Sequence, residues 1–322
     1  MKKILLTNKY SGAPEKIVKS EVPAGFEIIF LSEQTQKALL DEAADADYIL
    51  AGGRLKITGE VLERAGKLRM IQRSGVGLDA LDLDAIRQRG IPLYVNQGVN
   101  AESVAEHALL LILACLRRLP TICADTKNGI WKKQEQGVKT SELRGKTVGI
   151  IGMGNAARTL VGLLRPFHVN ILYSDLFRAP AEFEAENGMT YTDTDKLLSD
   201  SDIVSIHCAL TEETRGLINA ESIRRMKNGA ILVNTARGEI VEPEALAEGL
   251  ESGLLSYAAL DVHAKEPIPE DYPLKDIDNV ILTPHIAGVT ADSFRAMMHD
   301  AFRNIECFEN GELDVIAPYK YL

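Results

Sequence analysis

The sequence is poor in the features that mark secreted, membrane-spanning or metal-binding proteins. It has four cysteines in 322 residues, and none of them has the spacing of a metal site. No apolar run approaches the roughly 18 residues that a membrane-spanning helix needs, and the longest, Ala108–Leu116, is bounded by charged residues. The apolar run Ile4–Leu6 is shorter than the apolar region of a signal peptide, about 7 to 15 residues. We therefore expect a soluble cytoplasmic protein with reduced thiols, no metal and no membrane partner.

Basic charge is also scarce. Lysine and arginine total 36 against 46 aspartates and glutamates, a net charge of -10 that disfavours a nucleic-acid partner. Apolar residues at 46% and charged residues at 25% are ordinary for a globular protein. A chain of 322 residues is too long for one typical core, so we expect two domains.

Short apolar runs alternate with helical patterns through the first 98 residues. This alternation predicts a parallel sheet covered by helices on both faces. The expected strands are Lys3–Leu6, Phe26–Leu31, Tyr48–Ala51, Met70–Arg73 and Leu93–Val95, and the expected helices are Pro14–Ser20, Gln34–Asp41, Glu60–Ala65 and Leu83–Arg89.

An apolar helix is expected next, over Ala101–Leu119. Apolar residues lie on almost every face of this helix, so it should be buried or lie between domains or subunits. The stretch Asn128–Gly137 has a loop-like composition and holds the only tryptophan, Trp131. An exposed tryptophan would be costly, and two placements are equally compatible with the pattern: a subunit interface, or packing on the core of its own chain.

A second alternating series begins at Lys146 and predicts a second parallel sheet. A helix over Ala291–Asn310 follows it and is expected to return to the first domain. The strands of the series are Thr147–Ile151, Val169–Ser174, Ile203–His207, Ala230–Asn234, Tyr257–Asp261 and Val280–Leu282.

A glycine-rich turn follows the first strand of this second series. Val148–Ile151 runs into a Gly-x-Gly-x-x-Ala pattern, in which Gly152 permits the tight turn, Gly154 lets a pyrophosphate approach and Ala157 lets the next helix pack closely. The helix expected over Asn155–Pro166 would point its N-terminal amides at the phosphates. Asp175 ends the next strand, 23 residues after Gly152, where an acid binds the adenosine ribose.

These features predict an NAD site, because a carboxylate at position 175 would repel the extra phosphate of NADP. NADP stays a less favoured option, since Arg178 could hold a phosphate. The fold expected is α/β, with two doubly wound parallel-sheet domains. A flavodoxin-like substrate domain would comprise residues 1–98 and 291–322, and a Rossmann NAD-binding domain residues 99–290, joined by short hinges.

Polar groups gather where strands of the second series end. His207 and Asp261 end two strands, Arg237 and His285 closely follow two more, and Glu266 lies in the loop after Asp261. Ligands of open parallel sheets bind at this edge. Reduction of a 2-keto acid needs a hydride, a proton and a cation for the carboxylate. An imidazole supplies a proton near neutral pH, a carboxylate can orient it, and a guanidinium binds carboxylates with a planar fork.

The sequence resembles the D-isomer-specific 2-hydroxyacid dehydrogenase family. The matching segments are the nucleotide turn Gly149–Gly154, the second and third signatures Asp202–Thr211 and Met226–Gly238, then Leu260–Val262 with Glu266–Pro267, and Thr283–Gly288. The resemblance implies that Arg237, Glu266 and His285 are the catalytic set. It also implies a dimer whose nucleotide domains pack through the long helix.

The resemblance and the motifs together assign two further sets of residues. The predicted cofactor-binding residues are Gly152, Gly154, Asn155, Ala156, Asp175, His207, Ala209, Thr235, Ala236 and Asp261. The predicted substrate-binding residues are Ser74, Gly75, Val76 and Arg54, where backbone amides of the loop 74–79 would hold the substrate carboxylate.

The sequence departs from the family pattern at several of these positions. The family commonly has proline at position 209, arginine at 155 and isoleucine at 156, where this chain has Ala209, Asn155 and Ala156. The loss of the arginine predicts modest cofactor affinity. Phosphoglycerate members tend to carry more than one arginine near Gly52-Gly53-Arg54, so the single Arg54 disfavours a phosphorylated substrate.

The function expected is hydride transfer between NAD(H) and a small D-2-hydroxy acid or 2-keto acid of the glyoxylate, hydroxypyruvate or phosphoglycerate type. Two alternatives stay open at this level. An NAD-binding regulator or corepressor-like protein would keep the fold with little turnover. A different Rossmann enzyme, such as a methyltransferase using S-adenosylmethionine, fits the glycine turn but not the motif order around His285.

Overall fold

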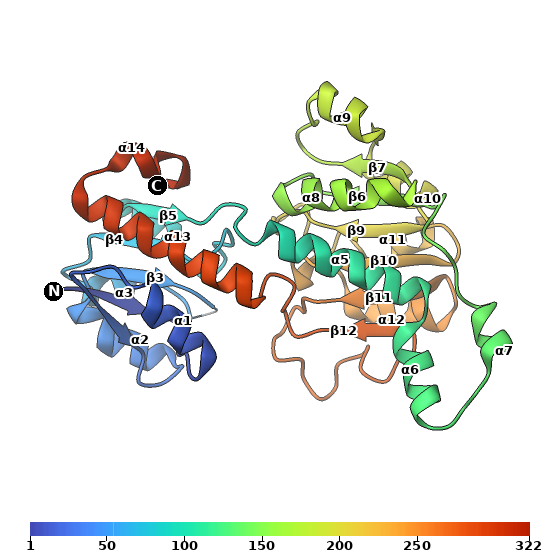
Figure 1. Ribbon diagram of the computed structural model, residues 1–322, viewed down its shortest axis with the longest axis horizontal. Helices are drawn as coiled ribbons and strands as arrows, with labels where there is room; N and C mark the ends of the chain where they lie inside the picture. Colours follow the sequence, from blue (N-terminus) through green and yellow to red (C-terminus); the bar gives the residue numbers. More distant parts are fainter. Residues whose placement is uncertain (54) are drawn as a thin grey trace. The chain divides into compact units, whose positions relative to one another are not determined.

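Two series of short apolar strands form two separate parallel sheets. The computed structural model describes residues 1–53 and 55–322. The chain divides into two compact units, Met1–Asn100 with Val289–Leu322, and Ala101–Gly288. Each unit has its own sheet with helices on both faces (Figure 1).

The first unit contains a five-stranded parallel sheet in the order β2-β1-β3-β4-β5. This is the flavodoxin-like order, as the sequence led us to expect. One face is covered by α2, α3 and α4, and the other by α1 and α13, which pack on opposite sets of strand residues. The bounds are β1 Lys2–Leu6, α1 Ala13–Glu21, β2 Phe26–Phe30, α2 Gln36–Glu42, β3 Tyr48–Ala51, α3 Gly59–Arg64, β4 Met70–Arg73, α4 Leu83–Gln88, β5 Leu93–Val95, α13 Ala291–Asn310 and α14 Leu313–Ile316.

The second unit contains a seven-stranded parallel sheet in the order β12-β11-β10-β9-β6-β7-β8. Starting from β6, this is the doubly wound Rossmann order, which reverses between β6 and β9. Helices α5 and α8 cover one face, and α10, α11 and α12 cover the other. The bounds are α5 Ala101–Leu116, α6 Leu119–Lys127, α7 Lys133–Gly137, β6 Thr147–Ile151, α8 Asn155–Leu164, β7 Asn170–Ser174, α9 Ala181–Asn187, β8 Met189–Tyr191, α10 Thr194–Asp200, β9 Ile203–Ile206, α11 Ala220–Arg225, β10 Ala230–Asn234, α12 Pro243–Glu251, β11 Leu255–Leu260 and β12 Val280–Leu282.

The structure corrects two sequence predictions around the long apolar helix. The helix ends at Leu116 rather than at Leu119, because Arg118 takes a left-handed conformation with φ 49° and a new helix, α6, begins at Leu119. The stretch expected to be a loop contains α7. Trp131 is 81% exposed, so packing on the core of its own chain was the wrong alternative. Figure 1 shows α6 and α7 projecting away from the sheet of their unit.

Two further features bear on the sequence predictions. The short edge strand β8 was not anticipated, because three residues are too few to show alternation. Among residues 1–53 and 55–322, no single helix is long and apolar enough to cross a membrane. Taken together, α5 and α6 have the length and composition of a membrane span, but the pair is bent by 62° at its junction. The four cysteines are free thiols.

Candidate active site

The glycine turn leaves the carboxyl end of β6 and leads into α8. Gly152 has φ 91°, a left-handed conformation that favours glycine, and a Cβ there would lie 2.4 Å from the backbone nitrogen of Cys208. Gly154 caps α8 without any side-chain hydrogen bond, and a Cβ there would meet nothing within 4 Å. The backbone is therefore accessible at the helix N-terminus, which suits a pyrophosphate. Ala157 is fully buried.

Asp175, at the end of β7, is oriented by backbone N–H groups. Its carboxylate accepts hydrogen bonds from Met153 N at 2.5 Å and from Phe177 N at 2.9 Å. The first donor belongs to the glycine turn itself, so the carboxylate is fixed next to Gly152 and Gly154. This is the arrangement in which an acid receives ribose hydroxyls while the turn holds phosphates.

Three more predicted cofactor positions follow β9 and β10. Burial lowers the pKa of His207 to about 4, so its ring is neutral near pH 7, and its Nε2 lies 2.8 Å from the Ser205 hydroxyl. Ala209 lies in the loop that follows, where its carbonyl accepts the Thr214 hydroxyl at 2.7 Å. Beyond β10, Ala236 N donates to the side chain of Asn234 at 2.9 Å, which fixes the turn.

Thr235 supplies the most direct indication that this edge receives a ligand. Its hydroxyl oxygen is buried and is one of two buried side-chain polar atoms in the described part of the chain without a hydrogen-bond partner. A buried hydroxyl without a partner is unfavourable, typically by about 1 to 3 kcal/mol. A polar group of a bound cofactor would satisfy it. Together with the open turn at Gly154, this fits a dinucleotide.

The catalytic residues predicted from the sequence come from the loops after β10, β11 and β12. Arg237 begins a tight segment in which its carbonyl accepts from Asn234 Nδ2 at 2.8 Å. Gly238 packs so closely that a Cβ there would lie 2.0 Å from the carbonyl carbon of His263. Only glycine permits this contact, which holds the Arg237 loop against the loop that carries Glu266.

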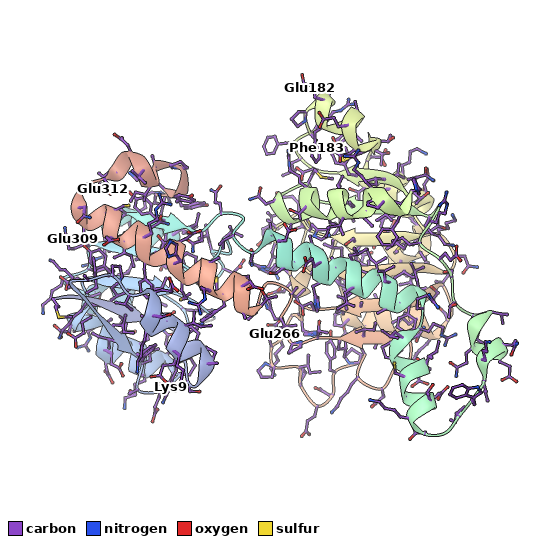
Figure 2. The ribbon with its side chains drawn as sticks, viewed as in Figure 1. Lys9, Glu182, Phe183, Glu266, Glu309 and Glu312 are labelled. Atoms are coloured by element: carbon purple, nitrogen blue, oxygen red, sulfur yellow. The ribbon has the colours of Figure 1, made fainter. Side chains whose placement is uncertain are left out.

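Glu266 joins the other two loops, and it is labelled in Figure 2. One carboxylate oxygen accepts from His263 N at 2.8 Å, and the other lies 3.0 Å from Nδ1 of His285. The Glu266 side chain is 11% exposed and that of His285 is 45% exposed. The carboxylate is therefore fixed from one side and presented to the imidazole on the other, an arrangement that orients the ring.

Asp261 is fully buried and turns out to hold the chain segment around His285. Its carboxylate accepts from the Thr283 hydroxyl at 2.6 Å, Ile286 N at 2.9 Å and Ala287 N at 2.8 Å. Its carbonyl accepts from His285 N at 2.7 Å. His285 itself has φ 56°, which is uncommon outside glycine and is maintained by these surrounding bonds.

The predicted substrate loop of the first unit follows β4. Ser74 N donates to the Ala51 carbonyl at 3.0 Å, Val76 is 54% exposed, and a Cβ on Gly75 would meet nothing within 4 Å. The loop is therefore open to a ligand at Gly75 and Val76. Arg54, the fourth predicted substrate residue, lies outside the described residues.

Sequence reasoning missed two residues that support these loops. Arg73 donates through Nε to the Gly77 carbonyl at 2.7 Å and through an Nη to the Ala51 carbonyl at 3.1 Å, so it ties the substrate loop to the end of β3. His263 lies 3.0 Å through Nε2 from the Thr283 carbonyl and 3.2 Å through Nδ1 from the Tyr272 hydroxyl. Its place two residues after Asp261 was the only sequence signal. Among the described residues, no cluster of three or more histidines, cysteines or acids could hold a metal.

Comparisons with known proteins bear on the whole arrangement. Residues 109–287 match the family model described as D-isomer specific 2-hydroxyacid dehydrogenase, NAD binding domain. The chain belongs to this family. A glyoxylate reductase from Thermofilum pendens is 40% identical over 87% of this chain and 83% of that protein. A hydroxypyruvate reductase from Thermotoga maritima is 38% identical over 84% of this chain and 87% of that protein.

A solved structure agrees with the fold. The D-lactate dehydrogenase from Aquifex aeolicus, complexed with NAD and lactic acid, superposes with a TM-score of 0.84 at 29% identity, covering 99% of this chain and 98% of that chain. As a D-2-hydroxyacid dehydrogenase, this chain is an NAD-dependent oxidoreductase that acts on CH–OH groups. The predicted family, fold class, enzyme class and cofactor are therefore confirmed.

Proposed function

We propose that Arg237, Glu266 and His285 carry out the reaction of this dehydrogenase. The observation that carries the proposal is the position of Glu266, held by the backbone of His263 and paired with Nδ1 of His285 at 3.0 Å. When the Nδ1–H group of a histidine donates to a carboxylate, Nε2 is the nitrogen that gains and loses a proton. In this proposal, protonated His285 donates from Nε2 to the ketone oxygen, and the reverse reaction returns the proton there.

Arg237 is proposed to bind the carboxylate of the keto acid. The guanidinium is permanently charged and planar, so it can make two parallel hydrogen bonds to a carboxylate. It would also stabilise negative charge on the reacting oxygen. The cofactor, when bound, supplies or accepts the hydride. We assign its phosphates to Gly152, Gly154, Asn155 and Ala156 and its ribose to Asp175, and its nicotinamide portion to His207, Ala209, Thr235, Ala236 and Asp261.

The substrate is proposed to be a small unphosphorylated 2-keto acid, such as glyoxylate or hydroxypyruvate. Two relatives, each matched by this chain over more than four-fifths of its own length, carry those substrates in their names. Arg54 is the sole arginine of its glycine-rich segment, which disfavours a phosphate group. Ser74, Gly75 and Val76 are proposed to bind the carboxylate through backbone amides.

A panel of 2-keto acids, followed by NADH absorbance, tests this proposal. Glyoxylate and hydroxypyruvate should oxidise NADH faster than pyruvate, and phosphohydroxypyruvate should be slowest. His285→Ala should reduce kcat far more than NADH affinity, and Arg237→Ala should raise KM and lower kcat together. If NADH binds but no acid oxidises it, the result favours the alternative role of an NAD-binding regulator. Equal loss of turnover and NADH binding in a folded His285→Ala protein would refute the acid role.

We also propose that the protein is a cytoplasmic homodimer without a nucleic-acid or membrane partner. The exposed apolar side chains of the segment 119–138 support the dimer, because Trp131 is 81% exposed and Val138 82% exposed. Leu110, on α5, is 54% exposed. Sedimentation equilibrium should give the mass of two chains, and Trp131→Ser should shift it toward one. A wild-type mass of 35.3 kDa, that of one chain, would refute the dimer.

A further inference from the structure

Arg178 lies three residues after Asp175, in the loop that follows β7. A cation at this position could attract the extra ribose phosphate of NADP, as arginines near this acid do in NADP-binding sites. Here the guanidinium is engaged elsewhere. Its Nε donates to one carboxylate oxygen of Glu184 at 2.9 Å, and an Nη donates to the other at 2.9 Å. The pair has the two-pronged geometry that makes arginine–carboxylate contacts strong and specific.

Glu184 is well placed to keep this contact. It lies on α9 with its side chain 11% exposed, and the fully buried Tyr173 donates its hydroxyl to the carboxylate at 2.5 Å. The same hydroxyl accepts from Ala179 N at 2.9 Å, which ties the loop to β7. The hydrogen bonds from Arg178 and Tyr173 lower the pKa of Glu184 to about 2, so the carboxylate is ionised at every pH at which the enzyme would be assayed.

Tyr191 links the guanidinium to the backbone of Asp175. The guanidinium is 5.6 Å from the ring centre of Tyr191, and the hydroxyl of that tyrosine donates to the Asp175 carbonyl at 3.3 Å. The Arg178 side chain is 65% exposed despite its contacts with Glu184.

We propose that Glu184 is a determinant of cofactor specificity that withholds Arg178 from the additional phosphate of NADP. Asp175 repels that phosphate, and Glu184 removes the nearby cation that would otherwise offset the repulsion. The selection of NAD is thus made twice, by one charge facing the ribose and by a second charge that occupies the arginine. This inference rests on the proposed role of Asp175 in binding the ribose.

Substitutions that remove a carboxylate charge while keeping the side-chain shape test the proposal. Asp175→Asn, alone and combined with Glu184→Gln, is assayed for kcat/KM with NADPH and NADH, and NADPH affinity is measured separately by fluorescence titration. Adding Glu184→Gln to Asp175→Asn should raise both kcat/KM and affinity for NADPH about tenfold, the size of one hydrogen bond to a charged group. Adding Arg178→Ala should then abolish the gain.

Glu182→Gln is the matched control. Glu182 lies two residues away on α9, is exposed and is labelled in Figure 2, so its substitution removes the same charge from the same helix without touching Arg178. It should change NADPH use by less than about twofold. If the Glu184→Gln protein melts below the assay temperature, Glu184→Asp replaces it, since a side chain shorter by one methylene loosens the two-pronged contact and should give a smaller gain in the same direction.

The outcomes distinguish the inferred role of Glu184 from the proposed role of Asp175 on which it rests. If Asp175→Asn leaves NADH affinity unchanged, the proposed role of Asp175 is wrong and the inference is overturned with it. If Asp175→Asn weakens NADH binding but Glu184→Gln adds no NADPH gain, only the inference is overturned. A gain that persists after Arg178→Ala, or that Glu182→Gln reproduces, is a general charge effect and also overturns it.

Discussion

Replacing Glu266 by glutamine tests the proposed catalytic arrangement with the least structural change. The glutamine carbonyl can still accept from His263 N, so the loop should keep its conformation. The amide NH2 then faces Nδ1 of His285, where a carboxylate oxygen lay at 3.0 Å. An amide cannot stabilise an imidazolium as a carboxylate does, so the substitution removes charge stabilisation from the proposed acid.

The magnitude follows from the distance and the exposure. The His285 side chain is 45% exposed and that of Glu266 is 11% exposed, so the dielectric of water sets the lower limit, at which two unit charges about 3 Å apart interact by about 1.4 kcal/mol. That energy corresponds to about one pH unit. The alkaline fall of kcat/KM for keto-acid reduction should therefore move at least about one unit toward lower pH, and the rate on that limb should drop at least about tenfold.

The assay is the pH profile of NADH-dependent reduction between pH 5 and pH 10, with glyoxylate as substrate. Glu270→Gln serves as the control, because Glu270 lies in the same loop, is exposed and carries the same charge. The control profile should superimpose on that of the unmodified enzyme. An unshifted profile for Glu266→Gln, with kcat/KM unchanged, would show that the carboxylate does not act on the reacting histidine.

Three further substitutions have defined outcomes. Arg237→Lys should raise KM for the keto acid about tenfold and lower kcat, both measured by steady-state titration of the keto acid. An ammonium group cannot form the two parallel hydrogen bonds that a planar guanidinium makes to a carboxylate. Gly238→Ala should lower the free energy of unfolding in urea by about 3 kcal/mol or more and reduce activity, because its Cβ would lie 2.0 Å from the carbonyl carbon of His263. His207→Asn should flatten the acid side of the stability profile. The folded-state pKa of about 4 lies below the ordinary histidine pKa of about 6.5, so protonation favours the unfolded chain. The unmodified protein should therefore lose up to about 3 kcal/mol between pH 6.5 and 4, measured by denaturant titration at each pH.

The sequence predicted most of the fold because parallel strands buried on both faces are continuous apolar runs. Tyr48–Ala51 and Ala230–Asn234 have the bounds that the apolar pattern indicated. The pattern did not indicate the break after Leu116, because charged residues such as Arg117 and Arg118 are also common inside helices and do not by themselves predict the left-handed conformation of Arg118. Whether Trp131 packs on its own core was equally undetermined, because burial depends on contacts distant in sequence.

The candidate site was predictable as a set of residues but not as a geometry. Strand ends and motif order led to Arg237, Glu266 and His285, whereas the bond from His263 N to Glu266 depends on how one loop folds. The contact of Arg178 with Glu184 was missed for a related reason. It requires α9 to begin at Ala181, and the segment showed no apolar periodicity from which a helix could be inferred.

The position of His285 depends on a chain of hydrogen bonds that begins on α5. The Thr283 hydroxyl has one hydrogen, which it donates to Asp261 at 2.6 Å, so the 3.3 Å contact with Nε2 of His107 must use an imidazole N–H. Asp261 in turn accepts the N–H groups of Ile286 and Ala287. A buried carboxylate that accepts several hydrogen bonds is costly to disturb, since loss of any donor leaves charge unsatisfied. The acid of the proposed reaction is thus held from two directions, with Glu266 fixing its ring and Asp261 fixing the backbone on either side of it.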